Sequence, residues 1–305
     1  MAGGEDAAVY GWPPPGLAQV PTGAVQLSPF DPAGVDLEEL QDDGLAEVVL
    51  ALPAGTIERR YVIAHGLRAL RVGGALTALA PKNRGGARLA GELRAFGCEP
   101  AENSRRHHKI CSCRRPTAVR GLREAIADGG PQIAPRLGLW SQPGVFSWDR
   151  LDTGSALLID AGLSFSGRGA DIGCGVGVLA QKALADPAVT GMLLVDFDAR
   201  AIAAARRNIT DSRASFLHAD IRQQLPELAD LDFAVMNPPF HAGGLRNHAL
   251  GQEFIAGAAA ALRKGGTCRM VANAALPYEV ALAEVFSKVV QLGRVAGYKL
   301  FEAVK

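Results

Sequence analysis

Two stretches of this chain repeat one order of apolar and glycine residues, and this repeat restricts the possible folds more than any other feature. The steps LRVGGALTALA (70–80) and LRKGGTCRMVA (262–272) align without a gap. Each step is preceded by an apolar run and a helix-forming segment. A strand, helix and strand unit that occurs twice predicts two related α/β domains with parallel strands joined by right-handed crossovers. Chance similarity between two ordinary units of this kind is the alternative.

The expected elements follow from the same runs. In each copy we predict a strand, a helix and a strand, at 46–53, 60–74 and 75–82 in the first and at 232–239, 253–266 and 267–273 in the second. The expected divisions of the chain are an irregular, acidic lead-in at 1–44, a first α/β domain at 45–135 and a second at 136–305. The first copy has LALPAG where the second has MNPPFH, and no glycine-rich loop precedes it. We therefore expect the first domain to have lost its site and kept the scaffold.

The composition is that of a soluble globular protein, with 48% hydrophobic and 21% charged residues. No apolar run approaches the ~18 residues that a membrane helix needs. The start of the sequence lacks the basic segment and apolar block of a signal peptide. Five scattered cysteines do not suggest a disulfide framework. We therefore expect a cytoplasmic protein that does not associate with a membrane.

The charges are distributed unevenly along the chain. Residues 1–44 contain eight acids and no Lys or Arg, whereas residues 59–123 contain fifteen Lys and Arg against three acids, a local balance of +12. Such a block suits a polyanion, because each cation that neutralises a phosphate releases counterions. Arg105, Arg106 and Lys109 lie in its densest part and are the candidate contacts to nucleic acid. A solvated basic face without a partner is the alternative.

Histidines and cysteines in the same block raise the question of a metal. Cys111 and Cys113 are separated by one residue, which is not a usual spacing for a zinc chelate. We expect ordinary thiols on a basic segment and no metal.

The segment GADIGCGVGVLA (169–180) has the form of a strand, a tight glycine turn and a helix start. Gly173, Gly175 and Gly177 let the backbone approach a ligand closely, and the new helix directs its N–H groups toward the gap. Alone, this loop fits nicotinamide, flavin or S-adenosylmethionine (SAM) sites, or only a tight turn. Asp171 on the strand favours SAM, whose ammonium group needs a nearby carboxylate, whereas a dinucleotide would place its phosphates over the helix.

Two further predicted strands also end in acids. Asp196 follows Gly177 by nineteen residues, the position from which a carboxylate can bind both hydroxyls of a ribose. Asp198 competes for this role but is better placed to cap the helix that follows. Asp220, after SFLHAD, can accept a hydrogen bond from an adenine amino group or can cap the next turn.

The fourth strand leads into NPPFH, at the edge of the sheet where ligands gather. An exocyclic amine on a base is a poor nucleophile because its lone pair is delocalised. The amide oxygen of Asn237 and the main-chain carbonyl of Pro238 can each accept one N–H bond, and the prolines fix both acceptors. Phe240 offers a face for stacking a flipped base, and His241 can stack, contact phosphate or position the loop. A plain turn is the alternative for these residues in isolation.

These motifs, together with PKNRGGARL (81–89), PGVFSWDRLDTGSALLI (143–159) and MVANAALPYE (270–279), resemble class I SAM-dependent methyltransferases, and more closely the bacterial ribosomal RNA guanine-N2 methyltransferases of the RsmC/RlmG type. The resemblance covers most of the chain from about residue 45. It implies two tandem Rossmann-like domains, the first degenerate and helping to hold RNA, the second catalytic with a seven-stranded sheet and an antiparallel edge hairpin. It also implies that Ser155 lies near the methionine end of SAM.

The sequence therefore predicts a SAM-dependent enzyme that methylates the N2 amino group of a guanine in 16S rRNA, with ribosomal RNA or the small ribosomal subunit as partner. The alternatives are a 23S rRNA guanine-N2 or adenine-N6 methyltransferase and a protein glutamine-N5 methyltransferase. The basic block and the Phe240–His241 pair argue against the protein substrate. A non-catalytic RNA-binding or assembly factor is the alternative from another class, and Asn237 with the glycine loop argues against it. No oligomeric state is predicted.

Overall fold

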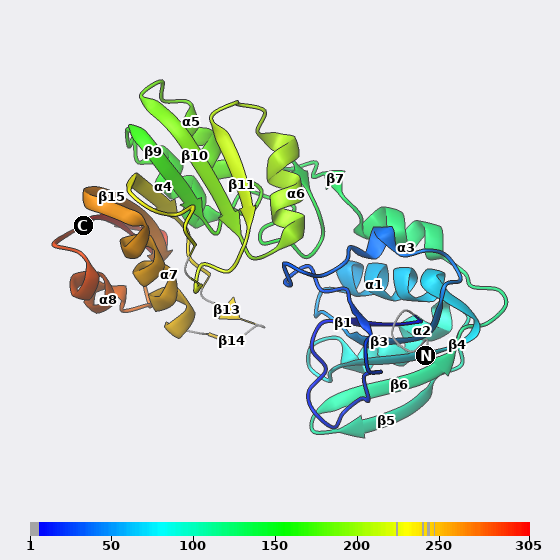
Figure 1. Ribbon diagram of the computed structural model, residues 1–305. Helices are drawn as coiled ribbons and strands as arrows, with labels where there is room; N and C mark the ends of the chain where they lie inside the picture. The colour runs from blue at the N-terminus through cyan, green and yellow to red at the C-terminus, as the bar shows by residue number, and fades with distance from the viewer. Residues whose placement is uncertain (1–5, 224, 240, 243–244, 247) are drawn as a thin grey trace. The chain divides into compact units, whose positions relative to one another are not determined.

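The structure is a computed structural model that describes residues 6–223, 225–239, 241–242, 245–246 and 248–305. The chain divides into two compact units (Figure 1). The first comprises residues up to 131 with 142–144, and the second comprises 132–141 with 145–305. The expected boundary, between residues 135 and 136, lies within this connecting region.

The first unit is built on a six-stranded sheet with the order β2-β1-β3-β4-β6-β5. Its strands are β1 (Ala7–Tyr10), β2 (Val25–Gln26), β3 (Leu45–Ala51), β4 (Leu70–Pro81), β5 (Ala101–Arg105) and β6 (His108–Arg114). Its α-helices are α1 (Thr56–Ala69), α2 (Leu89–Ala95) and α3 (Leu122–Gly129), with 3₁₀ turns at Leu37–Glu39 and Gly86–Arg88. The first four strands are parallel, and the β5–β6 hairpin adds antiparallel strands at one edge. Helices α1 and α3 lie side by side over one face (Figure 1).

The second unit is built on a seven-stranded sheet with the order β11-β10-β9-β12-β15-β17-β16. Its strands are β9 (Gly167–Ile172), β10 (Val189–Asp196), β11 (Ala214–His218), β12 (Leu231–Met236), β15 (Leu262–Asn273), β16 (Lys288–Val295) and β17 (Tyr298–Val304). Its helices are α4 (Thr153–Asp160), α5 (Val178–Leu184), α6 (Ala199–Asn208), α7 (His248–Ala261) and α8 (Tyr278–Val285). Two short hairpins pair β7 (Gln132–Ile133) with β8 (Trp140–Ser141) and β13 (His241–Ala242) with β14 (Leu245–Arg246). The predicted seven-stranded sheet with an antiparallel edge hairpin is confirmed.

The two sheets repeat one topology. Six neighbouring strands of the second sheet, from β10 to β16, stand in the same order and direction as the six strands of the first. Strands β4 and β15 each have twelve residues and the same sequence of buried and exposed positions. Each pairs with its parallel neighbour through a register that breaks after the first pair. This correspondence in structure supports two related domains over chance similarity.

The helices that precede these long strands end earlier than predicted. Helix α1 ends at Ala69 and helix α7 at Ala261, and the strands begin at the next residue rather than after the glycines. Gly73 and Gly265 have φ values of +77° and +79°, which a helix does not accommodate. The Gly-Gly pairs therefore belong to irregular starts of the strands.

The expected irregular lead-in at 1–44 needs correction, because it contributes two strands to the first sheet. All four residues of β1 are buried, and this strand pairs in parallel with both β2 and β3. A four-residue apolar run between prolines, glycines and acids is too short to give a periodic signal, and tertiary pairing decides its conformation.

Strand residues in the second unit alternate between two apolar layers. On β12, Ala234 and Met236 join the cluster with α7 and α8, whereas Phe233 and Val235 join the cluster with α4, α5 and α6. The sheet is thus buried on both faces, which leaves the ends of its parallel strands as the place for polar groups. Within the described part of the chain, no helix is both long enough and apolar enough to span a bilayer.

Candidate active site

The candidate site lies at the carboxyl ends of three neighbouring strands, β10, β9 and β12. In the sheet register, Ile172 at the end of β9 is paired with Val195 on one side and Met236 on the other. The residues that follow these three are Gly173, Asp196 and Asn237. Parallel strands thus bring the glycine loop, an acid and an amide to one level of the same edge, as the sequence predicted.

The glycine loop needs glycine at each predicted position. Gly173, Gly175 and Gly177 have φ values of +74°, +53° and +92°, all in the left-handed region. A Cβ on Gly177 would come within 2.8 Å of Cδ1 of Ile209, whereas a Cβ on Gly175 would meet nothing within 4 Å. Gly177 is therefore required by packing, and Gly175 lines open space where a ligand can approach the backbone.

Asp171 lies beneath this loop. Its side chain is fully buried, Oδ2 accepts a hydrogen bond from the Ala180 N–H in helix α5 at 3.0 Å, and Oδ1 has no partner among the described residues. Burial raises the pKa of this carboxyl to about 8. The observed contact anchors the start of α5, and the predicted contact with a cofactor stays a prediction.

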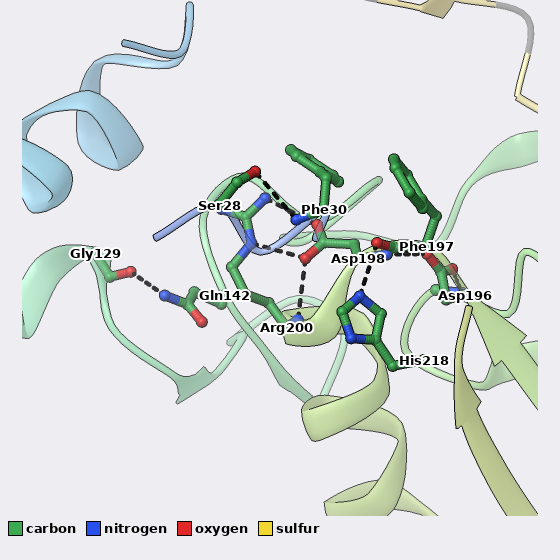
Figure 2. A network of polar contacts seen from close by, with 10 residues as sticks. Ser28, Phe30, Gly129, Gln142, Asp196, Phe197, Asp198, Arg200 and His218 are labelled. Carbon is green, nitrogen blue, oxygen red and sulfur yellow. Dashed lines mark hydrogen bonds and ion pairs between the residues drawn. The ribbon is translucent and has the colours of Figure 1, made fainter. Parts of the chain in front are cut away.

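Asp196 holds the loop from the neighbouring strand. Its Oδ2 accepts from the Gly175 N–H at 2.8 Å. Its Oδ1 accepts from the Asp198 N–H at 2.9 Å, and Figure 2 shows these two aspartates beside each other. The residue as a whole is half-buried, and desolvation raises the pKa of its carboxyl to about 6. Each carboxylate oxygen has a further lone pair, so the group can still accept from two hydroxyls. The helix-cap role predicted for Asp198 is confirmed, because its carboxylate accepts from the Arg200 N–H at the start of α6.

Asp220 has partners of its own in the turn after β11. Its Oδ1 accepts from the Arg222 N–H at 3.0 Å, and its carboxylate pairs with the Arg222 guanidinium at 2.5 Å. These hydrogen bonds hold the pKa of Asp220 below its usual range. The guanidinium also lies over the Phe197 ring, 5.8 Å from its centroid. The turn-capping alternative is therefore observed, and a contact with adenine stays a prediction.

Asn237 is fixed through one end of its amide. Its Nδ2 donates to Asp152 Oδ2 at 2.7 Å and to Ser155 Oγ at 3.0 Å. The two acceptors lie at the start of helix α4, where Asp152 is the N-cap and accepts from the Ser155 N–H at 2.9 Å. Pro238, the next residue, is buried. Oδ1 accepts no hydrogen bond from the described residues, so the amide oxygen is the end of Asn237 that is left for a ligand.

The NPPFH motif continues with Phe240 and His241. Phe240, predicted to stack a base, lies outside the described residues. The backbone of His241 begins the short strand β13, and its side chain is likewise outside the description. The structure therefore tests neither role.

A pocket connects the glycine loop to the amide. Its wall includes Gly173, Gly175, Ser155 and Asn237, which the sequence predicted together. It also includes a segment that sequence reasoning did not assign to the site, contributing Phe146, Ser147, Arg150, Leu151 and Asp152. The cap of α4 could have been found from an Asp ahead of a helical run. Its contact with Asn237 joins residues 85 positions apart and has no local signal.

These residues fit SAM on three structural grounds. The loop exposes backbone at Gly175, where a side chain would enter the pocket. Asp196 is half-buried beside Gly175, and its carboxylate oxygens have further lone pairs for paired hydroxyls. Asp171 retains an unpartnered buried oxygen behind the loop. Among the described residues, no group of three or more His, Cys, Asp and Glu side chains could hold a metal ion.

The first unit has the corresponding strand ends but different side chains. Register places Ala51 where the second unit has Asn237. The buried Arg59 occupies this edge, donating to the main-chain carbonyls of Pro53 and Ala54 at 3.2 and 2.7 Å. Gly85 lies against the guanidinium, since a Cβ there would come within 2.1 Å of Nη1. An internal arginine therefore takes two of the main-chain acceptors that follow this strand, at the positions that match 239 and 240 in the second unit.

The predicted RNA contacts lie on the β5–β6 hairpin of this unit. Arg105 and Arg106 donate to the carbonyls of Gly16 and Pro15, both at 3.0 Å, and Lys109 pairs with Glu102 at 2.5 Å. All three basic residues thus have internal partners.

The acidic lead-in also neutralises part of the basic block, through the pairs Arg68–Asp42 and Arg115–Asp43. Residues 1–131 contain fifteen basic and fifteen acidic residues, so the +12 balance of 59–123 is not the charge of the whole unit. The assignment of the hairpin residues to RNA binding stays a prediction.

Known proteins are similar to this chain at two levels: a family model matches the second unit, and curated relatives align with most of the chain. Residues 136–302 match the model of the methyltransferase small domain family. Among curated relatives, the ribosomal RNA small subunit methyltransferase C of Pseudomonas putida is 31% identical over 288 residues, covering 89% of this chain and 82% of that protein. The protein of the same name from Erwinia tasmaniensis is 32% identical over 266 residues, covering 83% and 74%.

A solved structure is similar over both units. It is the T. thermophilus 16S rRNA N2 G1207 methyltransferase (RsmC) in complex with AdoMet and guanosine, with a TM-score of 0.77 and 26% identity. The match covers 98% of this chain and 88% of that one.

Proposed function

Because the chain belongs to the methyltransferase small domain family, the family of the ribosomal RNA small subunit methyltransferases C, we propose that it transfers a methyl group from SAM to the N2 amino group of a guanine in 16S rRNA. The observation that carries this proposal is Asn237, fixed through Nδ2 beside the glycine loop with its amide oxygen left for a ligand. The similar structure holds AdoMet and guanosine, the cofactor and the nucleoside that this site would take.

In this proposal the second unit holds the cofactor along one edge of its sheet. The backbone at Gly173 and Gly175 would lie against SAM, and Asp196 would accept from both ribose hydroxyls. Asp220 would accept from the adenine amino group, and Ser155 would lie near the methionine end. SAM supplies an electrophilic methyl group on a positively charged sulfur.

The residues of the NPPF motif would act on the target base. The guanine N2 amine carries two N–H bonds and a lone pair that is delocalised into the ring. Asn237 Oδ1 and the carbonyl of Pro238 would each accept one N–H, which favours a tetrahedral nitrogen and directs its lone pair away from both acceptors. Phe240 would stack on the extruded base. One amine proton leaves to solvent after transfer, so the site needs no dedicated general base.

Other amine substrates would use the same two acceptors. Adenine-N6 in nucleic acid and a glutamine side chain in protein both present an N–H₂ group on a conjugated carbon. The relatives named for the small ribosomal subunit favour the guanine of 16S rRNA. A test must therefore identify the product as well as detect transfer.

The experiment is methyl transfer from labelled SAM to small subunits, large subunits and bulk protein from cells that lack this protein. The product is digested and identified by mass spectrometry. N2-methylguanosine from 16S rRNA is the expected result. N6-methyladenosine, methylglutamine or label confined to 23S rRNA would replace the proposed substrate with the one found. No transfer to any substrate by a folded, SAM-binding protein would reject the proposal.

A further inference from the structure

We propose that Asp152 is a positioning residue, which fixes the amide of Asn237 so that its oxygen, and not its nitrogen, faces the target amine. This inference rests on the function proposed above and adds a residue from a different part of the chain. An asparagine amide has an acceptor end and a donor end of nearly equal shape. Only the acceptor end can receive an N–H of the target, so rotation of the amide by half a turn would place two N–H₂ groups against each other.

The contacts of Asn237 allow one orientation. Nδ2 donates both of its hydrogens, to Asp152 Oδ2 at 2.7 Å and to Ser155 Oγ at 3.0 Å. An ionised carboxylate can only accept hydrogen bonds. In the rotated amide, Oδ1 would face this carboxylate and the donor would be lost. The chemistry of Asp152 therefore decides which end of the amide points to the pocket.

Asp152 is itself held by secondary structure. It is the N-cap of helix α4, with an extended backbone, and the oxygen that accepts from Asn237 also accepts from the Ser155 N–H at 2.9 Å. The partial positive charge of the helix N-terminus stabilises a carboxylate at this position. No Lys or Arg pairs with it in the described part of the chain. Its acceptor capacity is thus directed to Asn237 rather than to a cation.

The same contact strengthens the acceptor that the target uses. A hydrogen bond from Nδ2 to an anion polarises the amide and increases the negative charge on Oδ1. The first function of the pair is orientation and the second is electrostatic. Both act through Asn237 and require no contact between Asp152 and the substrate.

Two substitutions at one position separate orientation from helix capping. Asp152→Ser keeps a good N-cap but is too short to reach Asn237. Asp152→Asn keeps an oxygen that can accept both bonds now made to Oδ2, and it removes the charge. The full-length protein would be assayed by single-turnover methyl transfer to small subunits at saturating SAM, with the SAM Kd and thermal unfolding measured for each variant.

We expect Asp152→Ser to slow the transfer step by roughly 10- to 100-fold, the value of one charge-assisted hydrogen bond, with the SAM Kd changed less than about threefold. Asp152→Asn should recover part of the rate, because its side-chain oxygen can restore the orientation but not the charge. A wild-type rate in Asp152→Ser would overturn the proposal. So would an equal loss in both variants, which would point to the charge itself, or a loss of SAM affinity that explains the whole defect.

A measurement without RNA separates this proposal from the proposed function. The side-chain N–H₂ resonances of Asn237, assigned from their absence in Asn237→Ala, should be shifted downfield in the wild type and in Asp152→Asn and should move upfield in Asp152→Ser. If these shifts occur but the wild type methylates no RNA, the orientation by Asp152 stands and the substrate assignment fails. Identical resonances in all three proteins would overturn the orientation whatever the activity.

Discussion

Replacing Glu92 with leucine is expected to destabilise the first unit strongly, because it leaves a buried guanidinium without its anion. Arg59 is 0% exposed and Glu92 is 8% exposed. Two charge-assisted bonds join them, from Nε to Oε2 at 2.7 Å and from Nη2 to Oε1 at 2.6 Å. Removing one partner of such a pair costs about 3–5 kcal/mol. Three neutral acceptors of Arg59 remain, so we expect a cost of about 3 kcal/mol, at the lower end of this range.

The double variant Arg59→Met/Glu92→Leu gives the sharper test. It removes both charges, and apolar replacement of a whole buried pair is often close to neutral. The carbonyls of Pro53 and Ala54 lose a donor, at about 1 kcal/mol each. The double variant should therefore unfold at a free energy no lower than that of Glu92→Leu alone.

Hydrogen exchange of the amides in β3 and α1, followed against urea, measures the free energy of unfolding of the first unit by itself. A local measurement is needed because the two units need not unfold together. SAM binding serves as a control, since every residue that lines the pocket belongs to the second unit. If the double variant loses as much free energy of unfolding as Glu92→Leu and Arg59→Met lose together, the two residues contribute independently. The reasoning from a buried ion pair would then be refuted.

Three further outcomes are expected in the second unit. The carboxyl of Asp196 ionises as the pH rises through about 6, and its ionised form accepts hydrogen bonds from ribose hydroxyls. The affinity for SAM, measured by calorimetry, should therefore increase between about pH 5 and about pH 7.5. Asp196→Asn should abolish this pH dependence, and a variant with the wild-type pH profile would contradict the assignment. Gly175→Ala should lose SAM affinity at a cost in stability of about 1 kcal/mol, because its Cβ meets open pocket space. Gly177→Ala should melt lower than Gly175→Ala, since its Cβ would collide with Ile209, and the reverse order would contradict the packing argument.

The parts of the fold that the sequence predicted are those with strong local signals. The apolar runs of β10 and β12, the glycine loop and the acid at Asp196 are each visible within a few residues. The cap at Asp198 follows from its place before a helical run. Their meeting at one sheet edge follows from parallel topology alone.

The parts that could not be predicted depend on distant partners. Strand β1 is four residues long and exists because β2 and β3 pair with it. Part of the basic block is neutralised by acids more than 25 residues away, as in the pair of Arg68 with Asp42. The contact between Asp152 and Asn237 spans 85 residues. In each case the decisive interaction is tertiary, and no window of sequence contains both partners.

The most direct test of the central claim is the single-turnover rate of Asn237→Ala on small subunits, measured beside its SAM Kd. The amide oxygen acts on the target amine in the transfer step, so its removal should lower the rate by roughly 100-fold or more, as for other preorganised polar groups. The SAM Kd should change less than about threefold. A wild-type rate in Asn237→Ala, or a defect that saturating SAM restores, would contradict the assignment of this edge of the sheet as the place where the base is methylated.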